Sequence, residues 1–568
     1  MSKVLGIDLG TTYSCVAYID EFEKSVVVKN AEGDNTTPSV VYFESLENII
    51  VGEEAKNMLV VEPDCTIAFV KRSMGADDYE GNPMRFNIHG KDISPEEISS
   101  KILKKLVKDA NSELQSLGVL SENEEIKDVV ITCPAYFGMR EKAATKVAGE
   151  LAGLNVLDII NEPTAAAINY GVLKKQENKN VMVYDLGGGT FDVTIIKIDG
   201  QNINVVYSDG DRSLGGKDWD EKIADYLASE FNSATGIDYF DDEESANDIV
   251  LISEKAKKAL SSKTVTKVAL RSGGKSHTVN FTREKFNEIT STLLETTLIK
   301  TNECLNKAAS GEYKIGIDQI DEILLVGGSS KMPQIKEALD NKYNKDAKLF
   351  DPDEAVAKGA AIYAEIRHNY EFIITEIAKA QGKSKTEVEE AIESKNTDIM
   401  TEAKKYAVNV GNAGGSNLGG LNAIRISDTL SRTYGQELYN LATNSTFISN
   451  ILMKGNKLPT ELSEKSYTLE EGQTGCRIAI YESESSLKEM QCSEGKLLGE
   501  ARLDFGKPLP KQTEIVTKLK MENSGLLYMV ATEATTGARV EAQFTPSGGL
   551  NKNELMDATC RANNDSVN

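Results

Sequence analysis

Two aspartates that each stand between an apolar run and a glycine turn are the residues best placed to do chemistry in this sequence. Asp8 lies in the run VLGIDLGTT, and Asp185 lies in MVYDLGGGT much further along the chain. Glycines let backbone N–H groups approach phosphate oxygens, and a carboxylate beside such a turn binds phosphate through a hydrated magnesium ion. Either copy alone fits an ordinary β-hairpin with a capping aspartate, whereas the matched pair favours a triphosphate held from both sides.

A third phosphate-binding pattern is only superficial. Gly274, Lys275 and Ser276 resemble the end of a Walker A loop, but Ala269 stands five positions before Gly274, where that loop requires a glycine. These residues therefore predict a polar hairpin turn between two short strands.

The composition disfavours several other classes of protein. The net charge of −24 would repel nucleic acids and anionic membranes, and no apolar run approaches the length of about 18 residues that spans a bilayer. The seven cysteines are scattered and the three histidines are isolated, which disfavours a disulfide framework, a zinc site and histidine-based catalysis. The first residues carry no signal-peptide pattern, so we expect a cytoplasmic protein with neither nucleic acid nor membrane as a partner.

The repeated aspartate pattern predicts two related halves, each with a strand, a glycine turn and a second β-rich run. Between them, Ser94 and Pro95 begin a run with apolar residues spaced by three and four, which is typical of a capped helix. Another short apolar strand leads to a glycine turn at Gly327. Strands that alternate with helices indicate α/β layers over residues 1–366.

After residue 366 of this 568-residue chain, the composition and the spacing of apolar residues change. Residues 367–423 combine a charged helical stretch with a segment that holds five glycines, 411–420, which indicates a linker or an insert. Residues 424–546 carry short alternating runs, as expected for an all-β sandwich. These runs lie at 477–481, 515–521, 526–532 and 539–544. Residues 547–568 are expected to form a polar, frayed tail without an amphipathic helix.

Four motifs resemble the signatures of the DnaK-type seventy-kilodalton heat-shock chaperones, in the same order. They are GIDLGTTYSCVA from Gly6, INEPTAAA from Ile160, DLGGGTFD from Asp185 and DPDEAVA from Asp351. The likeness covers the first two-thirds of the chain. It implies a duplicated actin-like (RNase H-like) ATPase domain of the α/β class followed by an all-β sandwich domain, with ATP or ADP and Mg²⁺ as cofactors.

The resemblance implies a role for each matching residue of the phosphate site. Asp8 and Asp185 would hold Mg²⁺ through water. The phosphates would lie between two hairpins, formed by Gly10, Thr11, Thr12 and Tyr13 on one side and by Gly187, Gly188, Gly189 and Thr190 on the other. The resemblance also implies the catalytic residues, which would face the γ-phosphate or position the attacking water and the metal. They are Lys71, Glu162, Asp185, Thr190 and Asp192.

The nucleoside would be bound by residues from later segments of the same domain. The resemblance identifies them as Glu254, Lys257, Lys258, Ser261, Gly328, Ser329, Lys331 and Asp353. Lys258 and Lys331 depart from the pair of arginines with which many members enclose the adenine. Because a lysine cannot stack a planar head group on the base, we expect weaker adenine binding.

The β-rich segment is similar to the peptide-binding sandwich of the family, though more faintly. The positions that match the peptide pocket are Gln436, Tyr439, Tyr467 and Cys476. This set is more polar than an aliphatic pocket, and polar walls weaken apolar anchoring. The family's short leucine-rich linker and its helical lid are not found at their expected places. We therefore expect peptide affinity to depend only modestly on the bound nucleotide.

These features together predict an ATP-dependent chaperone that binds and hydrolyses ATP and binds extended apolar segments of unfolded clients. The partners implied by the resemblance are a J-domain co-chaperone and a nucleotide exchange factor. The alternative is a regulatory or scaffold ATPase that holds one specific partner through its divergent β-domain and insert. A sugar or acetate kinase of the same superfamily is disfavoured, because the ATPase signatures continue without a gap where a small-substrate pocket would be needed.

Overall fold

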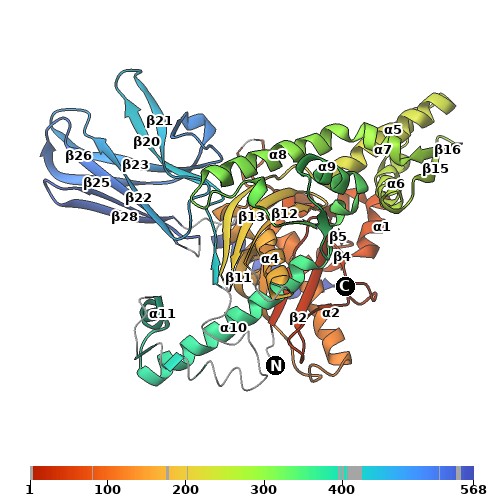
Figure 1. Cartoon of the computed structure of the whole chain (residues 1–568), viewed down its shortest axis with the longest axis horizontal. Helices are drawn as coiled ribbons and strands as arrows, with labels where there is room; N and C mark the ends of the chain where they lie inside the picture. The colour runs from red at the N-terminus through yellow and green to blue at the C-terminus, as the bar shows by residue number, and fades with distance from the viewer. Residues whose placement is uncertain are drawn as a thin grey trace.

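The computed structural model describes residues 4–79, 81–173, 178–200, 202–393, 398–399, 402–403, 406, 425–522, 525–544, 550 and 552–568. They form a mixed α/β domain and a β-domain that projects from one end of the molecule (Figure 1). The α/β class and the β-sandwich that follows it are as the sequence predicts. The glycine-rich residues 411–420, predicted to belong to a linker or insert, lie outside the described residues.

Two sheets of the α/β domain share one strand plan. The first has the order β11-β10-β1-β2-β3 and the second the order β18-β17-β12-β13-β14-β19. In each, the strand that carries the aspartate pairs antiparallel with the next strand and parallel with a later one. The predicted duplication is thus confirmed. The strands are β1 (Val4–Asp8), β2 (Tyr13–Ile19), β3 (Ser25–Val28), β10 (Asp128–Cys133), β11 (Asn155–Asn161), β12 (Lys179–Leu186), β13 (Phe191–Asp199), β14 (Asn202–Asp211), β17 (Glu322–Val326), β18 (Ala347–Leu349) and β19 (Arg425–Ser427).

Smaller elements complete the two lobes around these sheets. Helices cover the sheets, and buried apolar side chains, aliphatic and aromatic, fill a separate core in each lobe. The helices are α1 (Glu53–Val61), α2 (Pro95–Ser116), α3 (Met139–Leu151), α4 (Glu162–Leu173), α5 (Gly216–Thr235), α6 (Glu243–Ser262), α7 (Arg283–Ile289), α8 (Ser291–Ser310) and α9 (Pro333–Tyr343). The small strands are β4 (Thr37–Pro38), β5 (Val40–Phe43), β6 (Asn48–Val51), β7 (Thr66–Ala68), β8 (Phe86–Ile88), β9 (Lys91–Ile93), β15 (Val265–Ser272) and β16 (Lys275–Thr282).

Local predictions hold in these elements. Helix α2 begins with the predicted Ser94 cap, whose side chain accepts a hydrogen bond from the Glu97 N–H. The residues at Gly274 that resemble the end of a Walker A loop form the turn of the hairpin β15–β16, as predicted. None of the described helices combines the length and the apolar composition needed to cross a membrane.

Helix α10 (Ala355–Gln381) crosses between the lobes and depends on glycines at its contacts. A Cβ added to Gly6 on β1 would lie 2.0 Å from the Ala361 nitrogen, and one added to Gly359 would lie 1.7 Å from the Ala165 carbonyl oxygen. Only glycine allows these approaches. The helix continues without a break past residue 366, where the sequence suggested that the α/β region closes. Its second half packs against α11 (Lys385–Glu393) through a small buried cluster.

A short strand, β19, stands where the sequence predicted that the β-sandwich begins. β19 lies parallel to β14 at the edge of the second sheet, so residues 425–427 belong to the α/β domain and not to the β-sandwich. The pattern was missed because only one of its three residues is apolar.

The β-domain rests on the α/β domain through polar contacts close to β19. Asn161 donates to Asp428 at 2.7 Å, and Ser431 donates to the Phe137 carbonyl at 2.9 Å. Lys454 forms an ion pair with Asp209 at 3.0 Å. The two domains therefore touch at the side where β19 enters the second sheet.

The β-domain consists of two sheets around one apolar core. Their orders are β24-β21-β20-β23-β25 and β22-β26-β27-β28. The strands are β20 (Thr433–Asn440), β21 (Ser445–Leu452), β22 (Thr460–Tyr467), β23 (Gln473–Ser483), β24 (Glu489–Met490), β25 (Lys496–Leu509), β26 (Glu514–Met521), β27 (Leu527–Glu533) and β28 (Ala538–Phe544). All four alternating runs identified in the sequence correspond to strands, and only β27 begins one residue later than predicted.

The expectation of a frayed tail is wrong. Helix α13 (Lys552–Asn564) and strand β29 (Ser566–Val567) follow the β-domain and return to the first lobe, where β29 pairs parallel with β6. Their apolar content is low, so hydrophobic periodicity gave little signal. Charged contacts with α2, which composition cannot reveal, hold the segment in place.

Candidate nucleotide site

A cavity of about 480 Å³ lies between the two lobes, where the glycine turns after β1 and β12 face each other. This volume is within the usual range for a site that encloses a small molecule. Of the phosphate-site, catalytic and nucleoside-site residues predicted from the sequence, all but Gly189 and Asp192 line it directly. Asp192 lies just behind the wall, opposite Asp185 in the β12–β13 pairing.

The two hairpins pack against each other so closely that Gly188 and Gly189 cannot carry side chains. A Cβ added to Gly188 would lie 1.7 Å from Thr12 Oγ1, and one added to Gly189 would lie 2.2 Å from Thr11 Cγ2. The Gly187 N–H donates to the Thr190 carbonyl at 3.0 Å and so fixes the second turn. The backbone of both turns is therefore open to a ligand in the cavity.

Buried charged groups form the floor of the cavity. Lys71 lies in the 3₁₀ turn η2 (Val70–Ser73) and forms an ion pair with Glu162, the first residue of α4. Both side chains are almost fully buried. Thr132 at the end of β10 donates to Asp8 Oδ1 at 3.2 Å and holds that carboxylate at the mouth of its turn.

Electrostatics favour a cation at this floor. Burial raises the pKa of Asp8 to about 7, and the charge of Glu162 adds to the rise. Burial, together with Glu162, also raises the pKa values of Asp185 and Asp192 well above the ordinary range. Burial lowers the pKa of Lys71, but the charges of Glu162 and Asp8 outweigh it, so that pKa is raised and the lysine stays protonated. One lysine faces four carboxyl groups, and a divalent cation would relieve the imbalance.

The residues present fit a hydrated magnesium ion with a polyphosphate. Thr12 Oγ1 and Asp192 Oδ1 are buried polar atoms without a hydrogen-bond partner, and both lie beside the hairpins. Such atoms call for a polar ligand. Magnesium keeps several of its waters and uses few carboxylates, which suits Asp8 and Asp185. No group of three or more histidine, cysteine or carboxylate side chains able to hold a metal ion was found in the part of the chain that the structure describes.

The opposite end of the cavity is polar and suits a nucleoside. Helix α6 contributes Glu254, Lys257, Lys258 and Ser261 to the wall, and the turn η5 (Gly328–Lys331) contributes Gly328, Ser329 and Lys331. The two lysines that replace the family's arginines already have acidic partners, because Lys258 pairs with Glu254 at 2.7 Å and Lys331 pairs with Asp353. Lys257 instead pairs with Asp220 at 2.7 Å.

A bridge of side chains spans the mouth of the cavity between α1 and α6. Lys56 on α1 forms an ion pair with Glu254 on α6, and it also donates to the Tyr13 hydroxyl at 2.8 Å. Lys258 donates to the same hydroxyl at 2.9 Å. Burial raises the pKa of Glu254, but Lys56 and Lys258 outweigh it and lower that pKa to about 2. The bridge joins the first lobe to the second across the mouth of the cavity.

Several residues of this site escaped the sequence analysis. Lys56, Lys217 and Asp220 line the cavity, Thr132 supports Asp8, and Arg72 donates to the Gly189 carbonyl at 2.7 Å. Apart from Lys217, which follows Gly215 and Gly216, none of them belongs to a repeated or glycine-containing pattern. Their roles depend on contacts between segments far apart in the sequence, which no local spacing indicates.

The four positions assigned to a peptide pocket are not gathered on one surface. Gln436 and Cys476 face the core of the sandwich, and Gln436 Oε1 is buried without a partner. Tyr439 is three residues further along β20, so it points to the opposite face and is exposed. Tyr467 is exposed at the end of β22 in the other sheet.

Comparison with known families agrees with this architecture. The family model described as Hsp70 protein matches residues 4–412, which include both glycine hairpins and every residue assigned above to the nucleotide site. Members of this family are generally ATP-dependent chaperones that bind ATP or ADP with Mg²⁺ and act on polypeptides with co-chaperones. The chain belongs to the Hsp70 family.

Proposed function

We propose that this protein binds Mg-ATP in the cavity between its lobes and hydrolyses it as part of a chaperone cycle. One observation carries the proposal: two matched glycine hairpins close over a buried floor in which Lys71 faces the carboxyl groups of Glu162, Asp8 and Asp185. This arrangement offers backbone donors to phosphate oxygens and one fixed positive charge. Phosphoryl transfer needs little else from the protein than positioning and neutralisation of charge.

Each part of the cavity has a distinct task in this proposal. The backbone N–H groups of both hairpins hold the phosphates, and Lys71 neutralises the terminal phosphate. Glu162 and Asp192 orient the attacking water, and Thr190 fixes its approach. A bound Mg²⁺ would supply charge neutralisation at the phosphates, with Asp8 and Asp185 as its nearest carboxylates through water. The residues of α6, η5 and Asp353 hold the nucleoside.

Titration of the full chain with ATP by isothermal calorimetry, with and without Mg²⁺, tests the binding step. We expect binding that requires Mg²⁺ and slow hydrolysis in a single-turnover assay. The variants Asp8→Asn and Asp185→Asn should lose the dependence on Mg²⁺. ATP binding that is absent, or that is equal with and without Mg²⁺, would refute the proposal.

We further propose that the β-domain binds extended apolar segments of unfolded clients, and that a J-domain co-chaperone and a nucleotide exchange factor set the rates. The contacts between the domains support a link to the nucleotide, because Asp428 and Asn161 join the base of the β-domain to the residue before Glu162. Without a continuous apolar pocket at the four expected positions, we expect weak and quickly reversible peptide binding. A cytoplasmic location remains a prediction from the sequence.

The alternative function is a regulatory or scaffold ATPase that holds one specific partner through the β-domain. The scattered positions of Gln436, Tyr439, Tyr467 and Cys476 favour it. Fluorescence anisotropy with a labelled apolar peptide, in ATP and then in ADP, separates the two. Binding to several unrelated apolar peptides supports the chaperone, and no binding in either nucleotide supports the scaffold.

A further inference from the structure

Residues 552–568 lie against the first lobe as a second, separate docking element. Helix α13 buries small side chains against the lobe, those of Ala558 and Ala562. Four residues of α2 at helical spacing contact the segment, which means that one face of α2 is dedicated to it. They are Glu97, Lys101, Lys104 and Lys108.

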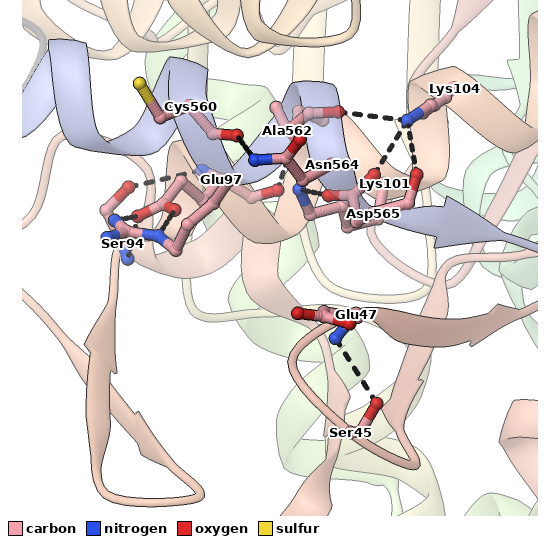
Figure 2. Close-up of polar contacts among 12 residues, drawn as sticks. Ser45, Glu47, Ser94, Glu97, Lys101, Lys104, Cys560, Ala562, Asn564 and Asp565 are labelled. Carbon is pink, nitrogen blue, oxygen red and sulfur yellow. Dashed lines mark hydrogen bonds and ion pairs between the residues drawn. The ribbon is translucent and has the colours of Figure 1, made fainter.

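Asp565 is the main anchor of the segment (Figure 2). Its side chain is 1% exposed and pairs with Lys101, and with Lys104 at 2.7 Å. Lys104 also donates to the carbonyls of Ala562 at 3.0 Å and Asp565 at 3.1 Å, so it caps the end of α13. A carboxylate buried this deeply is stable only while its partners stay in place.

A second charged contact fixes the helix at the other side. Arg561 donates two hydrogen bonds to Glu97, at 2.8 and 3.0 Å, in the planar geometry that suits a guanidinium and a carboxylate. Glu97 is only 3% exposed and also completes the cap of α2. The segment is thus held by three ion pairs with α2, and the carboxylate of each pair is buried.

Strand β29 then extends the outer sheet of the first lobe. The Ser566 N–H donates to the Glu47 carbonyl at 2.8 Å, the Asn568 N–H donates to Ile49 at 2.9 Å, and the Val51 N–H donates to Asn568 at 2.9 Å. Val567 enters the core of the lobe and is 3% exposed. β29 therefore pairs the edge of β6 that would otherwise be open.

β6 is directly continuous with the bridge over the cavity. It ends at Val51, and α1 begins two residues later at Glu53. The first turn of α1 carries Lys56, whose N–H donates to the Gly52 carbonyl and whose side chain pairs with Glu254 on the second lobe. The last residues described thus fix the strand from which this cross-cavity bridge extends.

We propose that residues 552–568 act as an internal strap that holds β6 and α1 in the position where Lys56 bridges the cavity, and so slows the release of bound nucleotide. The proposal rests on the proposed nucleotide binding. Each link is a direct contact: α2 holds Asp565, β29 pairs with β6, and β6 leads into α1. Release of the strap would leave an open sheet edge next to α1 and allow the bridge to break more often.

The test measures the dissociation rate of a fluorescent ADP analogue with Mg²⁺ from the full chain by stopped-flow displacement with excess ADP. Removal of residues 552–568 should raise this rate by about fivefold or more, the lower limit for coupling between distinct sites. Asp565→Asn, which keeps the chain complete, should raise it in the same direction. Met556→Ala is the control on the same helix, because Met556 is 63% exposed, and it should leave the rate unchanged.

A double-mutant cycle with Lys56→Met tests the route. If the strap acts through Lys56, its removal should change the rate by no more than about twofold in the Lys56→Met background. Hydrogen exchange should become faster over residues 48–61 and stay unchanged in β12 and β13, which would show that the variants are folded.

The outcomes separate this inference from the proposed function. An intact chain that does not bind the ADP analogue refutes the proposed function and the strap's role together. An intact chain that binds it, but releases it at the same rate after removal of the strap, overturns the strap alone. An equal effect of strap removal with and without Lys56 overturns the route through α1.

Discussion

Replacing Gly188 by alanine should disable the phosphate site, and the structure gives the size of the effect. An added Cβ would lie 1.7 Å from Thr12 Oγ1 and 2.6 Å from Thr12 Cβ. Rotation of the threonine side chain relieves the first clash but not the second, because the Cβ is attached directly to the backbone. The hairpins must therefore separate by roughly 1 Å to regain an ordinary carbon–carbon contact of about 3.5–4.0 Å.

A displacement of about 1 Å in groups that position a reacting substrate costs on the order of 100-fold in rate. We expect Gly188→Ala to slow single-turnover ATP hydrolysis by about this factor. Gly187→Ala is the matched control in the same turn, since the nearest atom to an added Cβ is the Thr190 carbonyl oxygen at 3.6 Å. That variant should stay within about threefold of the intact chain.

Rapid mixing with radiolabelled ATP gives both hydrolysis rates, and thermal melting shows whether the variants are folded. Hydrolysis by Gly188→Ala at the rate of the intact chain would contradict the close packing of the hairpins around the phosphates. An equal loss in Gly187→Ala would show that the effect does not come from the contact with Thr12.

Three further predictions concern the floor of the cavity and the contact between domains. Lys71→Ala and Thr190→Ala should lower the hydrolysis rate more than ATP affinity, measured by single turnover and calorimetry, and equal losses in both would contradict their assigned roles. The pKa of Asp8 is raised from its ordinary value of 3.8 to about 7 in the folded chain. Between these two pH values the folded chain therefore holds a proton that the unfolded chain has released. Without nucleotide, this group's stabilising contribution should therefore fall as the pH rises from about 4 to 7, by at most about 1.4 kcal/mol per pH unit, and thermal melting of Asp8→Asn should lack that component. Arg432→Ala removes a largely buried partner of Glu141, so the segment 425–432 should be cleaved several times faster in limited proteolysis, whereas unchanged cleavage would show that the pair does not hold the domains together.

Much of the nucleotide site could be predicted because its key residues occupy local patterns. A strand that ends in Asp-Leu-Gly before a turn of small residues indicates a hairpin with an aspartate beside it. The second copy at Asp185 favours a phosphate site over an ordinary hairpin with a capping aspartate. The cap at Ser94 and the hairpin at Gly274 are local in the same sense. In each case the residues that interact are within a few positions of one another, so spacing alone indicates the structure.

The parts that could not be predicted depend on partners far away in the chain. Lys56 meets Glu254, and Asp565 meets Lys101, only after the lobes have formed. Before folding, each is one more charged residue in a sequence that is 27% charged. The peptide-pocket positions were carried over from a faint likeness, and the spacing of three between Gln436 and Tyr439 already places them on opposite faces of a strand.

The two segments that flank the β-domain attach it to different lobes. β19 adds a strand beside β14 in the second sheet, whereas β29 adds a strand beside β6 in the first lobe. A change in the width of the cavity would move β6 relative to β14, and it would therefore change the distance between the two attachment points. The β-domain is thus connected to the nucleotide cavity at both of its ends, and a ligand that favours one cavity width over another would favour one position of the β-domain. The strap would make this dependence steeper, because it adds an attachment to the first lobe beyond the polar contacts at the base of the β-domain.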